Sequence, residues 1–250
     1  MRFRAGQAPA DIERRNRVHD VQRCAWARRT DGQLRKRCCD ELRRRQACPE
    51  RTERYRVGVL RRAIEGVIAR VVQQRFEDWQ FAAAITADTP RGRAFKRFGS
   101  GSLIAFPWVT IYNEHYIEIG SDTMLGPYIA LSAGMMPGQV CVTSPVVRIG
   151  DRCLIGRGSG IVGHLAIDIG NDVWTGHHVY ITDQNHGYED VTRPISHQTQ
   201  PERPVVIGDG SWLGAGTVVL PGATIGRHVA VGANSVVTGE LPDFCVAVGA

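Results

Sequence analysis

The sequence predicts an all-β fold in which short strands wind into stacked triangular coils, a parallel β-helix. From residue 117 onward an aliphatic residue returns every six positions, often followed by glycine, and a small or β-branched residue commonly stands four positions later. A six-residue period fits neither an α-helix nor a simple strand, but it fits a short strand plus a tight corner. Three such units close a coil of about 18 residues, and stacked coils bury one continuous aliphatic column.

The aliphatic positions of the repeat are expected to point into the prism, and the glycines after them to permit the backbone of the corners. A β-sandwich with regular turns is the alternative, and the constancy of the period argues against it. The expected core positions are Ile119, Leu125, Leu131, Ile149, Ile155, Ile161, Ile169, Ile181, Ile207, Leu213, Val219, Ile225, Val231 and Val237, with a miss at Thr175.

Upstream of the repeat, residues 60–85 carry apolar side chains at helical spacing, among them Leu60, Ile64, Ile68, Val71 and Val72. We expect an amphipathic helix that covers the open end of the first coil, because an exposed β-edge needs cover. A helix that binds a partner is the alternative. The predicted organisation is a helical cap and linker over 57–98, with residues 86–98 as the linker, and a β-helix over 99–250.

Residues 1–56 differ from the rest in charge. They hold 16 Arg and one Lys against 8 acidic residues, a net of +9, whereas residues 57–250 hold 14 basic and 17 acidic residues, a net of −3. The basic character therefore belongs to this segment, which is predicted to be disordered. A second hypothesis is that translation starts at Val57 or Val59 and that residues 1–56 are a start-site artefact. No nucleic-acid partner is expected.

Three segments of the repeat resemble the hexapeptide-repeat acyltransferases: IGDRCLIGRGSGIV, IGNDVWTGHHVYI and IGDGSWLGAGTVVLPGATIGRHVAVGANSVVTGELP. The resemblance covers roughly residues 100–250. It implies a left-handed parallel β-helix of about five coils, a homotrimer with active sites between neighbouring prisms, and acetyl-CoA as the acyl donor. The handedness comes from the resemblance alone, because crossovers between parallel strands are otherwise right-handed.

The repeat is interrupted over residues 181–208, ITDQNHGYEDVTRPISHQTQPERPVVIG. A long excursion from a compact repeat is commonly functional. The segment resembles the loop of the sugar and galactoside O-acetyltransferase branch, and this resemblance makes His186 the general base. A neutral imidazole suits the role because its pKa lies near the operating pH. Asn185 is a candidate for stabilising the oxyanion, and the groups that orient the base remain open among Asp183, Glu189, Asp190 and Glu202.

The same resemblance places the cofactor beyond this loop, along Trp212, Ala215, Ala233 and Thr238. Small side chains at these positions let backbone groups approach an extended pantetheine arm, although they are also the side chains that corners require. Two departures from the family stand out. Gly239 replaces a common lysine, and the chain stops where the family continues with a proline-containing segment and basic residues.

The other histidines have lesser expected roles. His164 is a candidate acceptor contact, His197 is expected at the loop rim, and His177 and His178 are expected to face opposite ways on a strand. No two of the histidines from 164 onward are five residues apart, which argues against the zinc site of the γ-type carbonic anhydrases that share this fold. The segment 132–146 also breaks the repeat, either to shape an acceptor pocket or as a surface bulge.

The expected function is acetyl-CoA-dependent transfer of an acyl group to a hydroxyl of a sugar or envelope-precursor acceptor, in a ternary complex and without a metal. A sugar-nucleotide N-acyltransferase and a catalytically degenerate β-helix scaffold are the alternatives. No signal peptide and no apolar run of transmembrane length is evident, so a cytoplasmic location is expected, and membrane association stays open.

Overall fold

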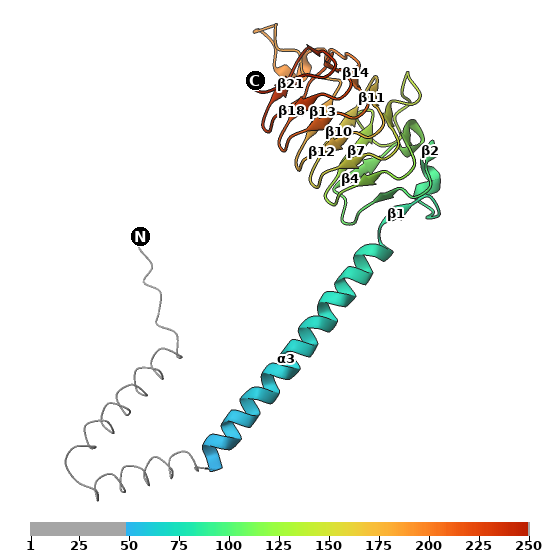
Figure 1. The fold of residues 1–250 in the computed structure, drawn as a ribbon. Helices are drawn as coiled ribbons and strands as arrows, with labels where there is room; N and C mark the ends of the chain where they lie inside the picture. The colour runs from blue at the N-terminus through green and yellow to red at the C-terminus, as the bar shows by residue number, and fades with distance from the viewer. Residues whose placement is uncertain (1–48, 250) are drawn as a thin grey trace, which may run out of the picture. The chain divides into compact units, whose positions relative to one another are not determined.

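The computed structural model describes residues 49–249 of the chain (Figure 1). They fall into two compact units, one ending at Gln73 and the other beginning at Gln74. Helix α3 (Pro49–Ala82) contributes to both. It begins at Pro49, before the helix predicted over 60–85, so residues 49–56 are helical and not disordered as predicted, and residues 1–48 lie outside the described part.

Within the first unit α3 presents its apolar side chains to solvent. Ile64, Ile68, Val71 and Val72 are between 50 and 61% exposed. The helix predicted for this segment is therefore confirmed, and its role as a cap stays a prediction. No helix within residues 49–249 is both long enough and apolar enough to cross a bilayer.

Within the second unit the last turns of α3 meet the first coil. Trp79 packs edge-on against Phe106 with ring centroids 4.7 Å apart, and Phe106 packs against Trp108 at 5.2 Å. The guanidinium of Arg91 lies 5.0 Å from the Trp108 ring centroid. This aromatic cluster lies at the start of the prism.

The prism has three sheets whose strands are parallel except for the first, β1, which pairs antiparallel with β3. The eight-stranded sheet contains, in spatial order, β1 (Ile85–Thr86), β3 (Leu103–Ile104), β6 (Met124–Leu125), β9 (Leu154–Ile155), β12 (Trp174–Thr175), β15 (Trp212–Leu213), β18 (Ala230–Val231) and β21 (Val246–Ala247). The six-stranded sheet contains β4 (Thr110–Tyr112), β7 (Ala130–Ala133), β10 (Gly160–Gly163), β13 (Tyr180–Thr182), β16 (Val218–Val219) and β19 (Val236–Val237).

The seven-stranded sheet contains β2 (Arg97–Phe98), β5 (Ile117–Ile119), β8 (Val147–Ile149), β11 (Ile167–Ile169), β14 (Val205–Ile207), β17 (Thr224–Ile225) and β20 (Glu240–Leu241). Three short 3₁₀ helices accompany the described strands: η2 (Gly92–Ala94), η3 (Glu114–Tyr116) and η4 (Ile195–His197).

The β-helix is longer than the sequence indicated. Each strand of the six-stranded sheet belongs to one complete coil, so the described residues form six coils rather than about five. Strands β1 and β2 also lie before residue 99, and Ile85 and Phe95 are buried in the core. The predicted linker over 86–98 is therefore wrong, because its irregular spacing concealed residues that start the first coil.

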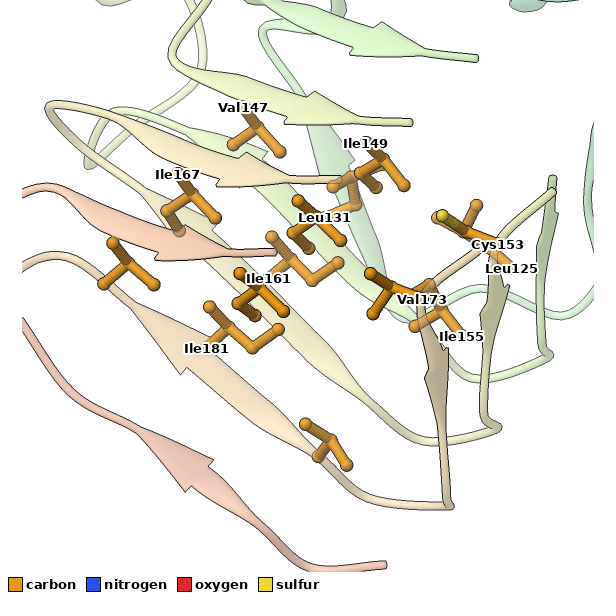
Figure 2. Close-up of a cluster of buried hydrophobic side chains, with 14 of the residues drawn as sticks. Leu125, Leu131, Val147, Ile149, Cys153, Ile155, Ile161, Ile167, Val173 and Ile181 are labelled. Carbon is orange, nitrogen blue, oxygen red and sulfur yellow. The ribbon is translucent and has the colours of Figure 1, made fainter. Parts of the chain in front are cut away.

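Every predicted aliphatic core position is buried, between 0 and 5% exposed, which confirms the repeat. Figure 2 shows how these side chains line up: Leu131, Ile161 and Ile181 come from successive strands of one sheet and stack in register. Thr175, the one repeat position in this run without an aliphatic residue, also lies inside the prism, where its hydroxyl accepts the Gly156 N–H at 2.9 Å.

The small residues four positions after the aliphatic ones are also buried, and several bond to the backbone of the next coil. The Ser211 hydroxyl donates to the Gly226 carbonyl at 2.9 Å and accepts the Val229 N–H at 3.0 Å. Ser159 accepts the Val179 N–H at 3.1 Å. Because buried polar groups must be paired, these hydroxyls hold successive coils in register.

Candidate functional site

The irregular connections of the prism gather along one edge, where the six-stranded sheet meets the seven-stranded sheet. We call it the loop edge. The segment between β7 and β8, the two-residue slip between β10 and β11 and the long interruption between β13 and β14 all cross this edge. His164 and the segment 132–146 are thus brought to the same edge as His186.

The long interruption is a hairpin-like excursion. Gln184 bridges antiparallel to Glu202, the Asn185 N–H donates to the Pro201 carbonyl at 3.2 Å, and the Gly187 N–H donates to the Thr199 carbonyl at 3.0 Å. A Cβ on Gly187 would lie 2.4 Å from the Thr199 carbonyl oxygen, so only glycine allows this approach. The tip is closed by the Gln198 amide, which donates to the Asp190 and Arg193 carbonyls.

His186 stands exposed on this excursion, next to Asn185. The Asn185 side-chain oxygen accepts the His186 backbone N–H at 2.9 Å. The Nδ1 atom of His186 lies 3.3 Å from Nε2 of Gln200, and this is the contact that the structure gives to the ring. The ring is thus accessible to a substrate, and one of its two nitrogens has a neighbour.

Asp183 has a structural role rather than the predicted one of orienting the base. It is fully buried, and its carboxylate accepts the backbone N–H groups of three consecutive residues, His164, Leu165 and Ala166, at 2.8, 2.8 and 2.6 Å. Both carboxylate oxygens are therefore engaged at the slip in the preceding coil. These hydrogen bonds fix the first residues of the excursion to the loop edge.

The three other carboxylates that the sequence left open also have partners of their own. Glu189 accepts the Tyr188 N–H at 3.1 Å, and Glu202 lies 3.4 Å from the Gln184 amide. The hydroxyl and the N–H of Thr192 bond to Asp190 and lower the pKa of its carboxyl. None of these carboxylates is bonded to His186 in the described residues.

The candidate cofactor residues lie away from His186 within one chain. Trp212 faces outward from the eight-stranded sheet, 49% exposed, and pairs with Trp174 on the neighbouring strand. Ala215 and Ala233 are exposed at the edge between the eight- and six-stranded sheets. Thr238 is at the loop edge, but it follows β19, two strands along the sheet from the β13 strand that leads to His186.

The remaining histidines are placed as follows. His164 is half-buried at the loop edge, where its backbone N–H is held by Asp183. His177 and His178 lie in a corner, not on a strand as predicted, and His178 has a left-handed φ of 58°. His197 is exposed in η4. Among the described residues no three His, Cys, Asp or Glu side chains come close enough to hold a metal ion.

Sequence reasoning missed Gln200, the residue that reaches the candidate base. A signal for it does exist. The excursion over 183–203 is centred on Arg193, and turn-forming residues over 190–194 surround this centre, so residues at equal distances from Arg193 would pair if the segment folds back on itself. His186 and Gln200 are such a pair.

Comparison with known proteins identifies the family. Residues 204–239 match a family profile described as bacterial transferase hexapeptide (six repeats), and residues 146–182 match the hexapeptide repeat of succinyl-transferase. The putative lipopolysaccharide biosynthesis O-acetyl transferase WbbJ of Escherichia coli K12 is 42% identical over 154 residues, which cover 59% of this chain and 74% of that protein.

Two further similarities agree with this. The probable acetyltransferase Rv3034c of Mycobacterium tuberculosis is 41% identical over 104 residues, which are 42% of this chain but only 35% of that protein's length. The fold is shared with AntD, an N-acyltransferase from Bacillus cereus solved with dTDP and coenzyme A, at a TM-score of 0.56 and 20% identity over 67% of this chain and 86% of that one. The chain belongs to the hexapeptide-repeat acetyltransferase family, whose fold is the left-handed parallel β-helix.

Proposed function

We propose that this protein transfers an acetyl group from acetyl-CoA to a hydroxyl of a sugar or sugar-containing envelope precursor, with His186 as general base. The observation that carries the proposal is the exposed imidazole on an excursion that interrupts an otherwise closed prism. The similarity to a protein named as an O-acetyl transferase supports a hydroxyl acceptor.

The proposed chemistry needs one proton acceptor. The Nε2 atom of His186 takes the proton of the acceptor hydroxyl as its oxygen attacks the thioester carbonyl. The carbon–sulfur bond then breaks, and the imidazolium returns the proton to the departing thiolate of CoA. Asn185, beside the base, is the candidate donor to the tetrahedral oxyanion. Both substrates are present together, so no acyl-enzyme is formed.

We propose further that each site is completed by a second copy of the chain, in a homotrimer. His186 lies on the loop edge, whereas Ala215 and Ala233 lie on a different edge of the same prism. One prism therefore separates the candidate base from most of the candidate cofactor residues, and a neighbouring copy would supply them. We place the enzyme in the cytoplasm, with its acyl donor.

The test is release of free CoA from acetyl-CoA in the presence of a panel of galactosides, glucosides and maltose. The variant His186→Ala is expected to lower kcat by about 10²–10⁴, the usual contribution of a general base. His197→Ala is the matched control, because it removes an exposed histidine from the same excursion, and it should keep wild-type turnover. Near wild-type turnover in His186→Ala would remove this residue from the mechanism.

Binding is tested separately by thermal unfolding with and without acetyl-CoA. At a ligand concentration of about 100 times Kd, specific binding stabilises the folded state by about 2.7 kcal/mol. A saturable rise in Tm in both wild type and His186→Ala is the expected result. Absence of any rise at millimolar acetyl-CoA would count against acetyl-CoA as the donor.

A further inference from the structure

We propose that Gln200 is the positioning residue of the site, and that its amide oxygen accepts the Nδ1–H of His186 so that the Nε2 lone pair faces the substrate. The proposal rests on the proposed function of His186 as general base. It replaces the carboxylates expected from the sequence with a neutral amide from the opposite side of the same excursion.

The pairing of the two residues follows from the backbone. The bonds from Asn185 to Pro201 and from Gly187 to Thr199 put His186 directly opposite Gln200 in an antiparallel arrangement. His186 and Gln200 then form the pair between two hydrogen-bonded pairs, where side chains lie closest and on the same face. The contact is thus set by register, and Gly187 keeps the two segments close enough to make it.

The side-chain atoms agree with this placement. The Gln200 amide is 3.3 Å from His186 Nδ1, and the Glu189, Asp190 and Glu202 carboxylates have the separate partners described above. No other side chain among the described residues makes a hydrogen bond to this ring. Gln200 is therefore the group that can select which ring nitrogen carries the proton, since that choice depends on the partner of the other nitrogen.

The chemistry decides which end of the amide faces the ring. In the structure Nε2 of Gln200 faces Nδ1, and Oε1 is buried without a hydrogen-bond partner in the described residues. The two ends of an amide have the same shape, so a half-turn exchanges them, and no hydrogen bond to Oε1 opposes that turn. Only the oxygen can accept Nδ1–H, and only a ring protonated at Nδ1 offers Nε2 as a base.

A neutral partner has a consequence that a carboxylate lacks. A carboxylate at Nδ1 would favour the imidazolium and raise the pKa of His186, whereas an amide oxygen orients the ring without adding charge. This distinguishes Gln200 from an acidic orienting residue in an experiment.

Three variants test the proposal: Gln200→Leu, Gln200→Glu and the matched control Gln184→Leu. Gln184→Leu removes the same amide from a nearby position of the same excursion, where the amide bonds to Glu202 and not to the ring. The first readout is the ¹⁵N NMR spectrum of histidine-labelled protein, with His186 assigned by comparison with His186→Ala. We expect the Nδ1–H tautomer in the wild type and in Gln184→Leu, and loss of that preference in Gln200→Leu.

The second readout is kinetic. Gln200→Leu should lower kcat by about 10- to 100-fold, part of the contribution of a general base, with little change in KM for acetyl-CoA. Gln200→Glu should restore turnover and move the acid limb of the kcat/KM profile upward by about one pH unit. A purely structural role would lower activity in both variants and leave the profile in place, which would overturn the proposal.

The two proposals fail in different ways. If His186→Ala keeps wild-type turnover, the proposed function fails, while the NMR spectra still decide whether Gln200 holds the ring. An Nε2–H tautomer in the wild type, or an unchanged tautomer in Gln200→Leu, would overturn the role of Gln200 whatever the activity. Thermal unfolding of each variant checks that the β-helix is still folded.

Discussion

Residues with left-handed backbone conformation mark the corners of the prism. Several such positions are glycines, and the side chain at the matching corner of the next coil covers them: His178 lies over Gly158, His228 over Gly210 and Asn234 over Gly216. At these three corners a side chain of one coil therefore covers a glycine of the preceding coil. The corner glycine is needed both for its backbone angle and for the space above it.

Replacing Gly158 by alanine tests this arrangement. Its φ is +70°, and an added Cβ would lie 2.4 Å from the His178 ring. Gly158→Ala should therefore lower the free energy of unfolding by about 1–3 kcal/mol, measured by urea denaturation. Gly239→Ala is the control, because no atom lies within 4 Å of its added Cβ and its φ is outside the left-handed range. Equal stability of the two variants would contradict the argument.

At the scale of elements, the excursion from 183 to 203 is folded rather than loose. Its ends are held together by the Arg203 N–H, which donates to the Asp183 carbonyl at 2.8 Å, and its tip is closed by Gln198. The buried carboxylate of Asp183 joins the excursion to the preceding coil. The proposed general base, His186, therefore has a defined position although it lies outside the prism.

Substituting Asp183 tests how strongly this anchor acts. In Asp183→Asn the amide offers one acceptor oxygen and presents an NH₂ group to backbone N–H donors. An unsatisfied buried donor costs about 1–3 kcal/mol, so we expect a loss of at least that size in the free energy of unfolding, together with reduced turnover. Asp209→Asn is the control, because Asp209 is exposed and accepts the Asn171 N–H alone. A variant as stable as the control would show that the anchor is dispensable.

At the scale of the whole β-helix, the three faces differ in polarity. The seven-stranded face carries alternating charges, with Arg97 beside Glu118 and Arg148 beside Asp168 on adjacent strands. The eight-stranded face carries an outward apolar row in register, of which Met124, Trp174, Trp212 and Val246 are between 42 and 79% exposed. An exposed apolar row of this length suits contact with other copies of the chain.

The proposed trimer is tested on this apolar row by sedimentation equilibrium. Trp174→Glu places a charge in the middle of the row and should shift the protein toward monomers at micromolar concentration, with loss of activity because each site needs two copies. Arg148→Gln on the charged face is the matched control and should remain assembled. If Trp174→Glu keeps the mass of the wild type, the contact lies on another face.

Periodicity made the coils predictable from the sequence. Leu131, Ile161 and Ile181 are buried because the same short strand recurs, each time with an aliphatic residue at the same position. This spacing can be read directly along the chain, so all predicted aliphatic core positions were found inside the prism. The start of the first coil was not predictable in the same way, because β1 and β2 come before the period is established. These two strands form because they pair with β3 and β5, which follow later in the chain, and no local sequence pattern marks them.

The sequence by itself determined the stacked coils of the prism and the position of their interruption, since repeat spacing is a local property. The tertiary structure decided which residues meet across space. It turned Asp183 into a buried anchor, separated Ala215 and Ala233 from His186, and brought Gln200 to the ring. Such contacts depend on the register of a folded excursion and on which edge of the prism a residue occupies, and no local pattern carries that information.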